Sequence, residues 1–355
     1  MDRATSNLIN RIETLTPDDI RATNVVLLPD FFLDHIVHVP DYPTIINDIA
    51  RIYTQRGGNI PNITQNLQQG GNAANTALAL ARLGMTSHLI CTTNYFGALF
   101  LNLYLKPHGV DLTKVKTDGD LAVTTALEFQ DTNANVMLSD AGSVKDFDYT
   151  SLTQDDLDSI AHADLVAVVN WTLNRHGTNL AKHVFRHAAH HSVKTFIDTG
   201  DPSHRTQDIP CLMKEVLTSP DLSILGVNEN ELTRYATSLS PNPTNNLADL
   251  ADILKHNITA RLDVHTSHIS YSLSTQTTAV PTYQLPRIHR STGSGDAWNA
   301  GNIFADLLGF PDPERLQFAN ALAACYLNQP IPLPPTLQDV ITFLNTVNLT
   351  VEESP

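Results

Sequence analysis

The chain has 355 residues, a formal net charge of −15, 42% hydrophobic residues and 17% charged residues. This length predicts one large α/β domain with an appendage, or two domains, because one small core cannot use so long a chain. The hydrophobic content excludes a disordered chain, and the negative charge argues against a nucleic acid or an anionic membrane as a partner.

The three cysteines, Cys91, Cys211 and Cys325, are odd in number and far apart. This pattern predicts reduced, buried thiols and argues against a disulfide framework. The N-terminal residues contain no apolar segment of the signal-peptide type, and no run approaches the ~18 apolar residues of a membrane span. We therefore expect a cytoplasmic protein without a membrane segment.

The first elements of the chain are a polar segment and an apolar run. Residues 1–22 predict a helical N-terminal extension, in which Thr16 begins a short capped helix. The apolar run Asn24–Leu28 is typical of a buried parallel strand. Residues 31–69 show strand-like alternation and then a polar passage that is rich in Asn and Gln.

A glycine pair at residues 70–71 opens a segment that is rich in Ala and Leu and ends at Gly84. The segment predicts a helix whose small side chains let another element pack closely, with Asn72 and Asn75 near its start. A tightly packed alanine helix with Asn caps explains the pattern as well. For this segment alone, that structural interpretation is the better one.

Apolar runs and amphipathic segments alternate along the rest of the chain. Such alternation predicts a doubly wound α/β sheet with right-handed crossovers. The predicted strands are residues 88–92, 122–130, 135–138, 165–169, 195–198, 222–227 and 268–273. The predicted helices are residues 153–160, 180–190, 247–255, 297–308 and 316–327.

Residues 291–301 read Ser-Thr-Gly-Ser-Gly-Asp-Ala-Trp-Asn-Ala-Gly. Small residues ahead of an apolar segment predict a loop that enters a helix, and the backbone N–H groups and dipole of a helix N-terminus favour anionic oxygens. A carboxylate repels an anion, so Asp296 in the first turn indicates a base that acts beside a phosphate. An N-cap Asp on a Gly-rich turn is an equally good explanation for this stretch alone.

Together, the two glycine-rich segments resemble the two signatures of the ribokinase family, the PfkB-type carbohydrate kinases. These signatures are a Gly-Gly-x-x-x-Asn helix start in the first third of the chain and a Gly-x-Gly-Asp near its end. Residues 228–231, Asn-Glu-Asn-Glu, are similar to the family's Asn-x-x-Glu motif. Asp34 lies where an early strand of the family carries a substrate-binding Asp, and residues 316–327, with Asn320, resemble its Ala-rich helix facing the adenine.

The resemblance extends from about residue 24 to about residue 330. It implies a ribokinase-like α/β fold, a doubly wound and mostly parallel sheet flanked by helices, with a small β-sheet lid. It places the kinase domain at residues 23–340 and the lid at about 31–69 and 110–142. A Pro-rich surface linker would then lead to a C-terminal helix and tail at residues 341–355. Homodimers that form through the lid are also implied.

The resemblance further implies ATP and Mg²⁺ as cofactors, and transfer of the γ-phosphate to a hydroxyl of a sugar, sugar phosphate or nucleoside. Asp296 would be the general base, and the backbone N–H groups of Gly293, Ser294 and Gly295 would hold the phosphoryl group. The residues implied in substrate binding are Asp34, Gly71, Asn72, Asn75 and Asn170. Those associated with the nucleotide or with Mg²⁺ are Asn228, Glu231, Thr266 and Asn320, with Mg²⁺ held through water and no direct metal ligand.

Some features leave alternatives open. Residues 262–268 contain no glycine, where the family often has a Gly-containing turn, and Asn72 stands where ribose kinases often have Lys. Asn170 is explained equally well as a polar residue at a strand end. The alternatives to a sugar kinase are a nucleoside kinase of the same family and a catalytically silent member that binds a ligand or acts as a scaffold. The intact Gly-Ser-Gly-Asp argues against the silent member.

The helix predicted at residues 180–190 and the residue after it carry four histidines: His183, His187, His190 and His191. Zinc could bridge residues that are four apart on one helix. The spacing supplies no fixed third ligand, however. We therefore expect a half-exposed helix face here.

Overall fold

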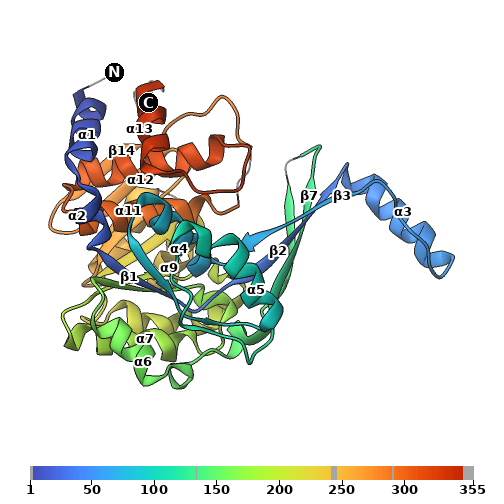
Figure 1. Cartoon of the computed structure of the whole chain (residues 1–355), viewed down its shortest axis with the longest axis horizontal. Coiled ribbons are helices and arrows are strands. Elements are labelled where there is room, and N and C mark those ends of the chain that lie inside the picture. The colour runs from blue at the N-terminus through green and yellow to red at the C-terminus, as the bar shows by residue number, and fades with distance from the viewer. Residues whose placement is uncertain (1–2, 133, 241–245, 290–291, 347–355) are drawn as a thin grey trace.

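The computed structural model describes residues 3–132, 134–240, 246–289 and 292–346. Its centre is an eight-stranded sheet with the order β14-β13-β12-β11-β10-β9-β1-β4 (Figure 1). The strands from β4 to β12 in this order are parallel, and β13 and β14 are antiparallel. The predicted mostly parallel sheet is confirmed. Its strands are β1 (Asn24–Leu28), β4 (Thr86–Leu89), β9 (Leu165–Val169), β10 (Lys194–Asp198), β11 (Ile224–Asn228), β12 (Arg261–His265), β13 (Ile269–Leu273) and β14 (Thr277–Pro281).

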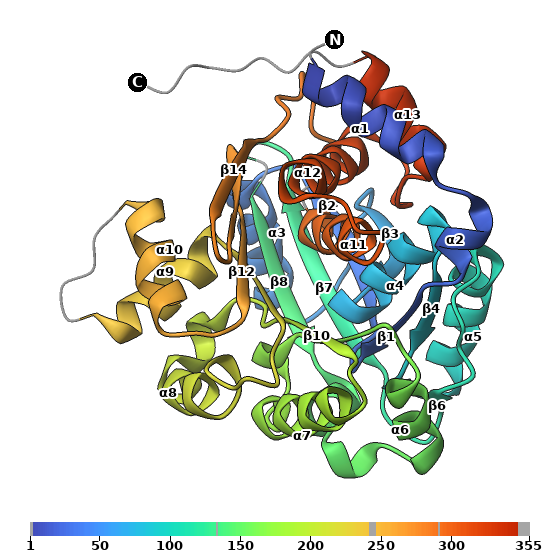
Figure 2. The same ribbon diagram turned by 90° about the vertical axis from the view of Figure 1, so that its left-hand side faces the viewer.

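Apolar runs form the central strands because helices cover both faces of the sheet (Figure 2). In β1, Val25 and Leu27 lie in one hydrophobic core, whereas Val26 and Leu28 lie in a second core on the opposite face. Successive side chains of a strand point to opposite faces, so a strand between two helical layers is apolar at every position. The predicted doubly wound arrangement is therefore confirmed.

Each core is closed by its own set of helices. The first contains residues of α1 (Arg3–Thr14), α2 (Pro17–Arg21), α4 (Asn72–Leu83), α5 (Tyr95–Tyr104), α11 (Ser294–Leu307), α12 (Asp312–Asn328) and α13 (Leu337–Thr346). The second contains residues of α6 (Gln154–Ala161), α7 (Gly177–His190), α8 (Ile209–Leu212), α9 (Glu229–Leu239) and α10 (Leu247–His256). The elements that carry the two glycine-rich signatures, α4 and α11, thus share one layer.

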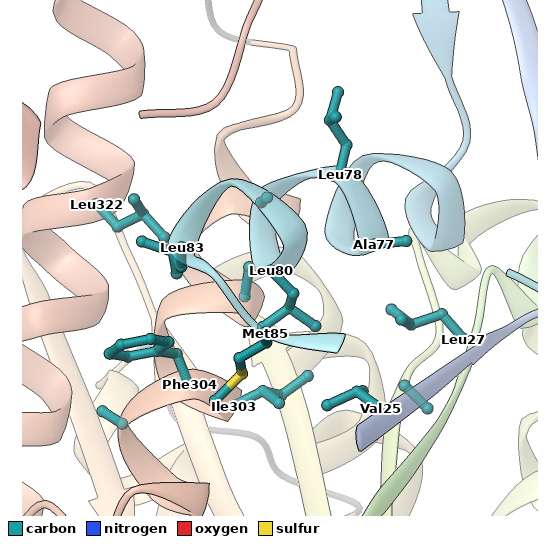
Figure 3. Packing of buried hydrophobic residues seen from close by; sticks show 14 of the residues in the cluster. Val25, Leu27, Ala77, Leu78, Leu80, Leu83, Met85, Ile303, Phe304 and Leu322 are labelled. Carbon is teal, nitrogen blue, oxygen red and sulfur yellow. The ribbon is translucent and has the colours of Figure 1, made fainter. Parts of the chain in front are cut away.

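The Ala-rich helix α4 packs on β1 and beside α11, as Figure 3 shows for Ala77 and Leu80 against Leu27 and Ile303. The helix begins directly after Gly71 and ends at Gly84, whose φ of 100° is in the left-handed region. Glycine adopts this conformation without a steric penalty and so ends the helix. The tight packing predicted for this segment is confirmed.

Both ends of the described chain lie on the first layer. In Figure 1, α1 and α13 lie close together near α12. Arg11 of α1 forms an ion pair with Glu314 of α12, and Thr16 caps α2 as predicted. The last helix begins at Leu337, before the predicted boundary at 341, and tail residues 347–355 lie outside the described residues.

A separate four-stranded sheet stands beside the main body. Its order is β3-β2-β7-β8, with β2 (Phe32–Val39), β3 (Thr64–Gly70), β7 (Ala122–Phe129) and β8 (Asn135–Asp140). Helix α3 (Tyr42–Thr54) connects β2 to β3 and projects away from the body (Figure 1). A two-stranded sheet, β5 (Cys91–Thr92) with β6 (Val115–Lys116), completes the strands of the described chain.

Departures from the predicted elements fall both in the main body, where β12, β14, α5, α8 and α9 were not predicted, and in this four-stranded sheet. The Asn/Gln-rich passage forms β3, whose first four residues are exposed, so no apolar alternation marks it as a strand. Helix α3 was not predicted either, because its segment lies within residues 31–69, whose pattern indicates strand-like alternation. The other predicted strands and helices are present, with ends that shift by a few residues.

Two compositional predictions can be compared with the structure. Cys91 and Cys325 are buried free thiols, but the prediction for Cys211 is wrong, because Ile209 and Leu212 carry the buried face of α8 and leave Cys211 exposed. Over the described residues, no helix combines the length and the apolar character needed to cross a membrane.

Candidate functional site

Polar residues gather at the carboxyl edge of the parallel sheet, where the N-termini of α4 and α11 also meet. The residues at or just after the strand ends are Asp30, Asn170, Asp198, Asn228 and His265. In open α/β sheets, ligands bind at this edge, outside the carboxyl ends of the strands. The edge is therefore the candidate site.

One hydrogen bond joins the two glycine-rich signatures, through residues that lie 221 positions apart in the chain. Asn75 Nδ2 donates to Asp296 Oδ2 at 2.8 Å. Asp296 lies in the first turn of α11, and only 8% of its surface is exposed. The structure thus brings the predicted base and one predicted substrate-binding residue into direct contact.

Burial raises the pKa of Asp296 well above its usual range. The hydrogen bond from Asn75 acts in the opposite direction, and the neighbouring carboxylates Asp198, Asp30 and Asp34 raise the pKa further. A carboxylate whose pKa lies closer to neutrality is a stronger base for abstracting a proton. The electrostatic environment therefore suits a general base.

The turn before α11 requires glycine at its first position. Gly293 has a φ of 84°, and a Cβ there would lie 2.9 Å from Tyr326 Oη. The first helical hydrogen bond runs from Ala297 N to Gly293 O at 3.1 Å. The N–H groups of a first helical turn have no partner within the helix and carry the positive end of its dipole. The predicted anion hole thus has the geometry of a helix N-terminus.

Asp34 occupies a buried position on β2. Burial and the nearby carboxylate of Asp30 raise its pKa to about 7. A Cβ on Gly70 of the adjacent strand would overlap the Asp34 carboxyl group, so the glycine leaves room for this side chain. No hydrogen bond to the Asp34 carboxyl group comes from the residues that the structure describes. Its predicted binding of substrate stays a prediction.

Asp30, which the sequence analysis missed, organises the start of α4. Its carboxylate is fully buried and accepts hydrogen bonds from Asn72 N (2.9 Å), Ala73 N (2.8 Å) and Asn170 Nδ2 (2.8 Å). The described contacts of Asn72 and Asn170 are therefore structural, and their predicted binding of substrate stays a prediction.

Gly71 lets the start of α4 pack against the chain that enters β2. Its φ is 91°, and a Cβ would lie 3.0 Å from both Phe31 Cα and Phe32 N. The conformation and the space each require glycine. This glycine therefore fixes the position of α4 relative to β2, which carries Asp34.

Asn228 and Glu231 form a capping box at the start of α9. Asn228 donates to Glu231 from N (3.0 Å) and from Nδ2 (2.9 Å). Glu231 is 2% exposed, and burial and Asp198 raise its pKa well above the usual range. Asp198 accepts hydrogen bonds from Asn299 Nδ2 and Gly200 N.

Negative charge in this cluster is not neutralised by a described side chain. In the part of the chain that the structure describes, neither Asp198 nor Glu231 forms a salt bridge. A hydrated divalent cation is compatible with such a donor set, because Mg²⁺ prefers oxygen ligands and keeps several waters. The residues present therefore fit the Mg²⁺ that the sequence implied, held through water.

A cavity of about 550 Å³ opens beside the glycine turn. Its lining includes the strand-end residues Asn228, His265 and Thr266, the turn residues Ser294 and Gly295, and three small or aliphatic residues of α12, Ala323, Ala324 and Leu327. The predicted Ala-rich helix thus forms one wall. This is the cavity in which the resemblance places the nucleotide.

Asn320 and Thr266 line this cavity, and their side chains form hydrogen bonds with other groups of the protein. Asn320 Oδ1 accepts from Trp298 Nε1 (2.8 Å) and from Ser270 Oγ (2.6 Å). Thr266 Oγ1 donates to Ile269 O and so stabilises the β12–β13 turn. Their predicted association with the nucleotide stays a prediction.

A second cavity, of about 890 Å³, lies between the four-stranded sheet and the body. Thr292 lines this cavity, Ser294 and Gly295 line the first one, and Ile288 lines both. Asn135 of β8 donates to Thr292 Oγ1 at 3.4 Å, which links the sheet to the glycine turn. The turn before Asp296 therefore lies between two adjoining cavities.

The histidine row on α7 does not form a cluster with the ligands that zinc needs. Ring nitrogens of His183, His187 and His191 each bond to a backbone carbonyl. Across the described residues, no group of three potential metal ligands is present. The partial exposure of these residues agrees with a half-exposed helix face.

Sequence reasoning missed several residues of the site: Asp30, Asp198, His265, Trp298 and Asn299. Asp30 and Asp198 stand just after or at the end of predicted strands, and His265 ends β12, which was not predicted. Their position at a carboxyl edge is a signal that could have found them. Asn299 and Trp298 follow Asp296 on α11 and are recognisable only from the helix packing.

The comparisons with known proteins agree with this geometry. The model of the pfkB family of carbohydrate kinases matches residues 44–334. Among solved structures, adenosine kinase from Sinorhizobium meliloti has a TM-score of 0.73 at 18% identity and covers 90% of this chain and 97% of its own. Ribokinase from Arabidopsis thaliana, solved with ribose and ATP, has a TM-score of 0.70 at 17% identity, with coverage of 91% and 99%.

A nucleoside kinase from Methanocaldococcus jannaschii has a TM-score of 0.65 at 18% identity and covers 92% of this chain and 99% of its own. At these identities, the structural likeness shows the fold alone. No curated protein sequence matches the chain.

Proposed function

Because the chain belongs to the pfkB family of carbohydrate kinases, we propose that it transfers the γ-phosphoryl group of ATP to a hydroxyl group of a sugar or nucleoside. The observation that supports this most is the hydrogen bond from Asn75 to Asp296. It joins the two family signatures beside the turn between two cavities. One cavity can then hold the nucleotide and the other the acceptor.

In this mechanism, Asp296 accepts the proton of the attacking hydroxyl group while its oxygen bonds to the γ-phosphorus and the bond to the leaving ADP breaks. Asn75 holds the carboxylate in position. The N–H groups of Gly293, Ser294 and Gly295 bind the phosphoryl oxygens at the positive end of α11. Bound Mg²⁺ would neutralise phosphate charge, and Asn228 and Glu231 would bind its water molecules.

The four-stranded sheet acts as the lid over the acceptor. The strand register places Asp34, Gln68, Thr124 and Ser139 in one cross-strand row on the face that carries Ile36 and His38. Ile36, His38 and Gln68 of this face line the larger cavity. Asp34 can therefore accept hydrogen bonds from hydroxyl groups of an acceptor under the lid. Closure of the lid excludes water from the γ-phosphate.

The charges around the larger cavity favour an acceptor without a phosphate group. Its described lining contains the carboxylate of Glu128, which contacts His38, a second imidazole at His289, and no Lys or Arg. A phosphorylated sugar needs cationic partners to replace its hydration. We therefore place uncharged sugars and nucleosides ahead of sugar phosphates as acceptors.

The other face of the lid supports the homodimer. Val136 and Leu138 of β8 are 46% and 59% exposed, and the register places them side by side on the face opposite to that of Ile36 and His38. Exposed apolar side chains that adjoin one another favour association. Light scattering should give a dimer mass for the protein and a monomer mass for Leu138→Glu.

ADP release from ATP, measured over pentoses, hexoses, inositol, nucleosides and sugar phosphates, tests the proposed function. We expect acceptor-dependent ADP release with at least one uncharged acceptor and none with Asp296→Asn. If ATP binds but no acceptor in the panel stimulates ADP release, the catalytically silent alternative gains support.

A further inference from the structure

The cavity of about 550 Å³ beside the glycine turn, in which the proposed function places the nucleotide, lacks a fixed positive charge among its described residues. Its lining contains the carboxylate of Glu229 but no Lys or Arg. Catalysis of phosphoryl transfer depends mainly on positive potential around the phosphate oxygens. Of the described side chains that line this cavity, only His265 can gain a positive charge.

His265 lies directly at the glycine turn. It ends β12, in register with Asn228 of β11. Its Cε1 is 3.6 Å from the point where a Cβ on Gly295 would lie. Its Nε2 is buried and has no hydrogen-bond partner in the part of the chain that the structure describes. A buried polar atom without a partner is rare in a folded protein and calls for a ligand or an ion as its explanation.

The imidazole ring is held in place by a chain of contacts from α12. Its ring stacks on Trp298 with centroids 4.8 Å apart. Trp298 Nε1 donates to Asn320 Oδ1 at 2.8 Å, and Asn320 is fixed by Ser270 and by backbone carbonyls of β14. The ring is therefore preorganised beside Gly295, and Asn320 acts on the cavity through Trp298.

The charges around His265 allow it to change protonation state. Burial lowers the pKa of His265, and the carboxylate of Asp198 on β10 acts in the opposite direction. Asp198 also interacts with Glu231 on α9 and with Asp296 on α11. Near neutral pH the free protein therefore carries a neutral imidazole, and an arriving polyanion favours its charged form.

We propose that His265 takes up one proton from solvent when the nucleotide phosphates bind at the glycine turn, and that the imidazolium then donates a hydrogen bond to a phosphate oxygen. The positive charge is thus created only in the complex. This inference rests on the proposed function, because it needs a nucleotide in this cavity. It assigns the cationic phosphate contact to a strand end that lies in neither glycine-rich signature.

Calorimetry of Mg²⁺–ADP binding tests the proposal directly. At pH 8 the nucleotide is fully ionised, because the second pKa of a phosphate is about 6. Binding heats in buffers of different ionisation enthalpy then report proton uptake by the protein. We expect uptake of a measurable fraction of a proton, which falls as the pH rises, in the unmodified protein and in the control His268→Asn. His268 is exposed and lies in the same β12–β13 turn.

His265→Asn should bind Mg²⁺–ADP without proton uptake. Its kcat/KM for ATP should fall by about 10²-fold, as for loss of one donor to the transition state. In the unmodified protein the KM for ATP should rise toward alkaline pH, and in His265→Asn that rise should be absent. Circular dichroism confirms that the variant is folded. Proton uptake by the unmodified protein does not depend on any variant.

The outcomes separate the two proposals. Nucleotide binding and acceptor phosphorylation without proton uptake would overturn the role of His265 and leave the proposed function intact. Proton uptake that persists in a folded His265→Asn would also overturn it. If the unmodified protein binds no nucleotide, the proposed function and this inference both fail.

Discussion

Asn75 on α4 donates a 2.8 Å hydrogen bond to Asp296 on α11, and this bond stabilises the charged form of a buried carboxylate. Replacing Asn75 with Ala should therefore raise the pKa of Asp296 further. A base with a higher pKa becomes protonated, and therefore inactive, at a higher pH as the pH is lowered. The acid limb of the kcat/KM profile should move to higher pH in Asn75→Ala.

At neutral pH the kcat/KM of the same variant should fall by roughly 10–100-fold. This factor corresponds to the free energy of a hydrogen bond to a charged group. Asn72→Ala is the matched control for the position of the acid limb, since its described polar contact is a backbone one to Asp30 and not to Asp296. An acid limb that stays in place in Asn75→Ala would contradict the assignment of this limb to Asp296.

Asp34 lowers the stability of the protein when it is ionised. Its pKa in the folded state is about 7, above the usual 3.8. A carboxyl group with a raised pKa contributes stability that is complete below the unfolded pKa and is lost as the pH rises through the folded pKa. Asn is neutral at every pH. The thermal midpoint of Asp34→Asn should therefore exceed that of the unmodified protein by a margin that grows from about pH 4 to about pH 7 and is constant above it.

Differential scanning calorimetry at several pH values measures this margin. Asp118→Asn is the control, because Asp118 is an exposed Asp of the same chain. A margin for Asp34→Asn that is the same at pH 4 and pH 8 would show that the Asp34 carboxyl group titrates normally in the folded protein.

The Asp34 carboxyl group occupies the space that a side chain at position 70 would need. An Ala side chain at position 70 would overlap the Asp34 carboxyl group. Gly70→Ala should therefore lower the free energy of unfolding by roughly 1–3 kcal/mol, the usual cost of overpacking. In an Asp34→Ala background the cost should nearly vanish. A double-mutant cycle from denaturant unfolding measures this, and additive effects would rule out the contact.

Glu231 interacts with Asp198 in a cluster that no described cation neutralises. Glu231→Gln keeps the shape of the capping box but leaves a side chain that cannot ionise at the proposed site of hydrated Mg²⁺. The Mg²⁺ concentration for half-maximal rate should rise by roughly 10-fold or more. Glu229→Gln, on the exposed side of the same turn, is the control. A collapse in rate with unchanged Mg²⁺ dependence would give Glu231 another role.

Local patterns predicted the strands of the central sheet other than β12 and β14, because strands between two helical layers are apolar throughout. β1 and β9 are such runs, and their boundaries agree with the structure. β3 is different, since it is a polar strand whose pairing with β2 holds it in place. Polar residues on a two-sided exposed strand leave no periodic signal, so only the tertiary pairing reveals it.

Site residues that lie in a sequence signature could be predicted. Site residues that only the fold brings together could not. Asp296 and Asn75 lie in the two glycine-rich signatures, and the structure joins them. Asp30 and Asp198 lie in no motif, and only the convergence of strand ends brings them near Asp296. Sequence spacing does not report which strand ends are neighbours, because the strand order differs from the chain order.

The central claim is that Asp296 acts as the base in transfer of a phosphoryl group to a hydroxyl. Asp296→Asn preserves the size of the side chain and the start of α11 but cannot accept the proton. The most direct measurement is the single-turnover rate of acceptor phosphorylation by Asp296→Asn, with nucleotide binding measured in parallel by calorimetry. The account predicts a rate ~10²–10⁴-fold below that of the unmodified protein with nucleotide affinity retained. A rate within a few-fold of the unmodified protein would contradict it.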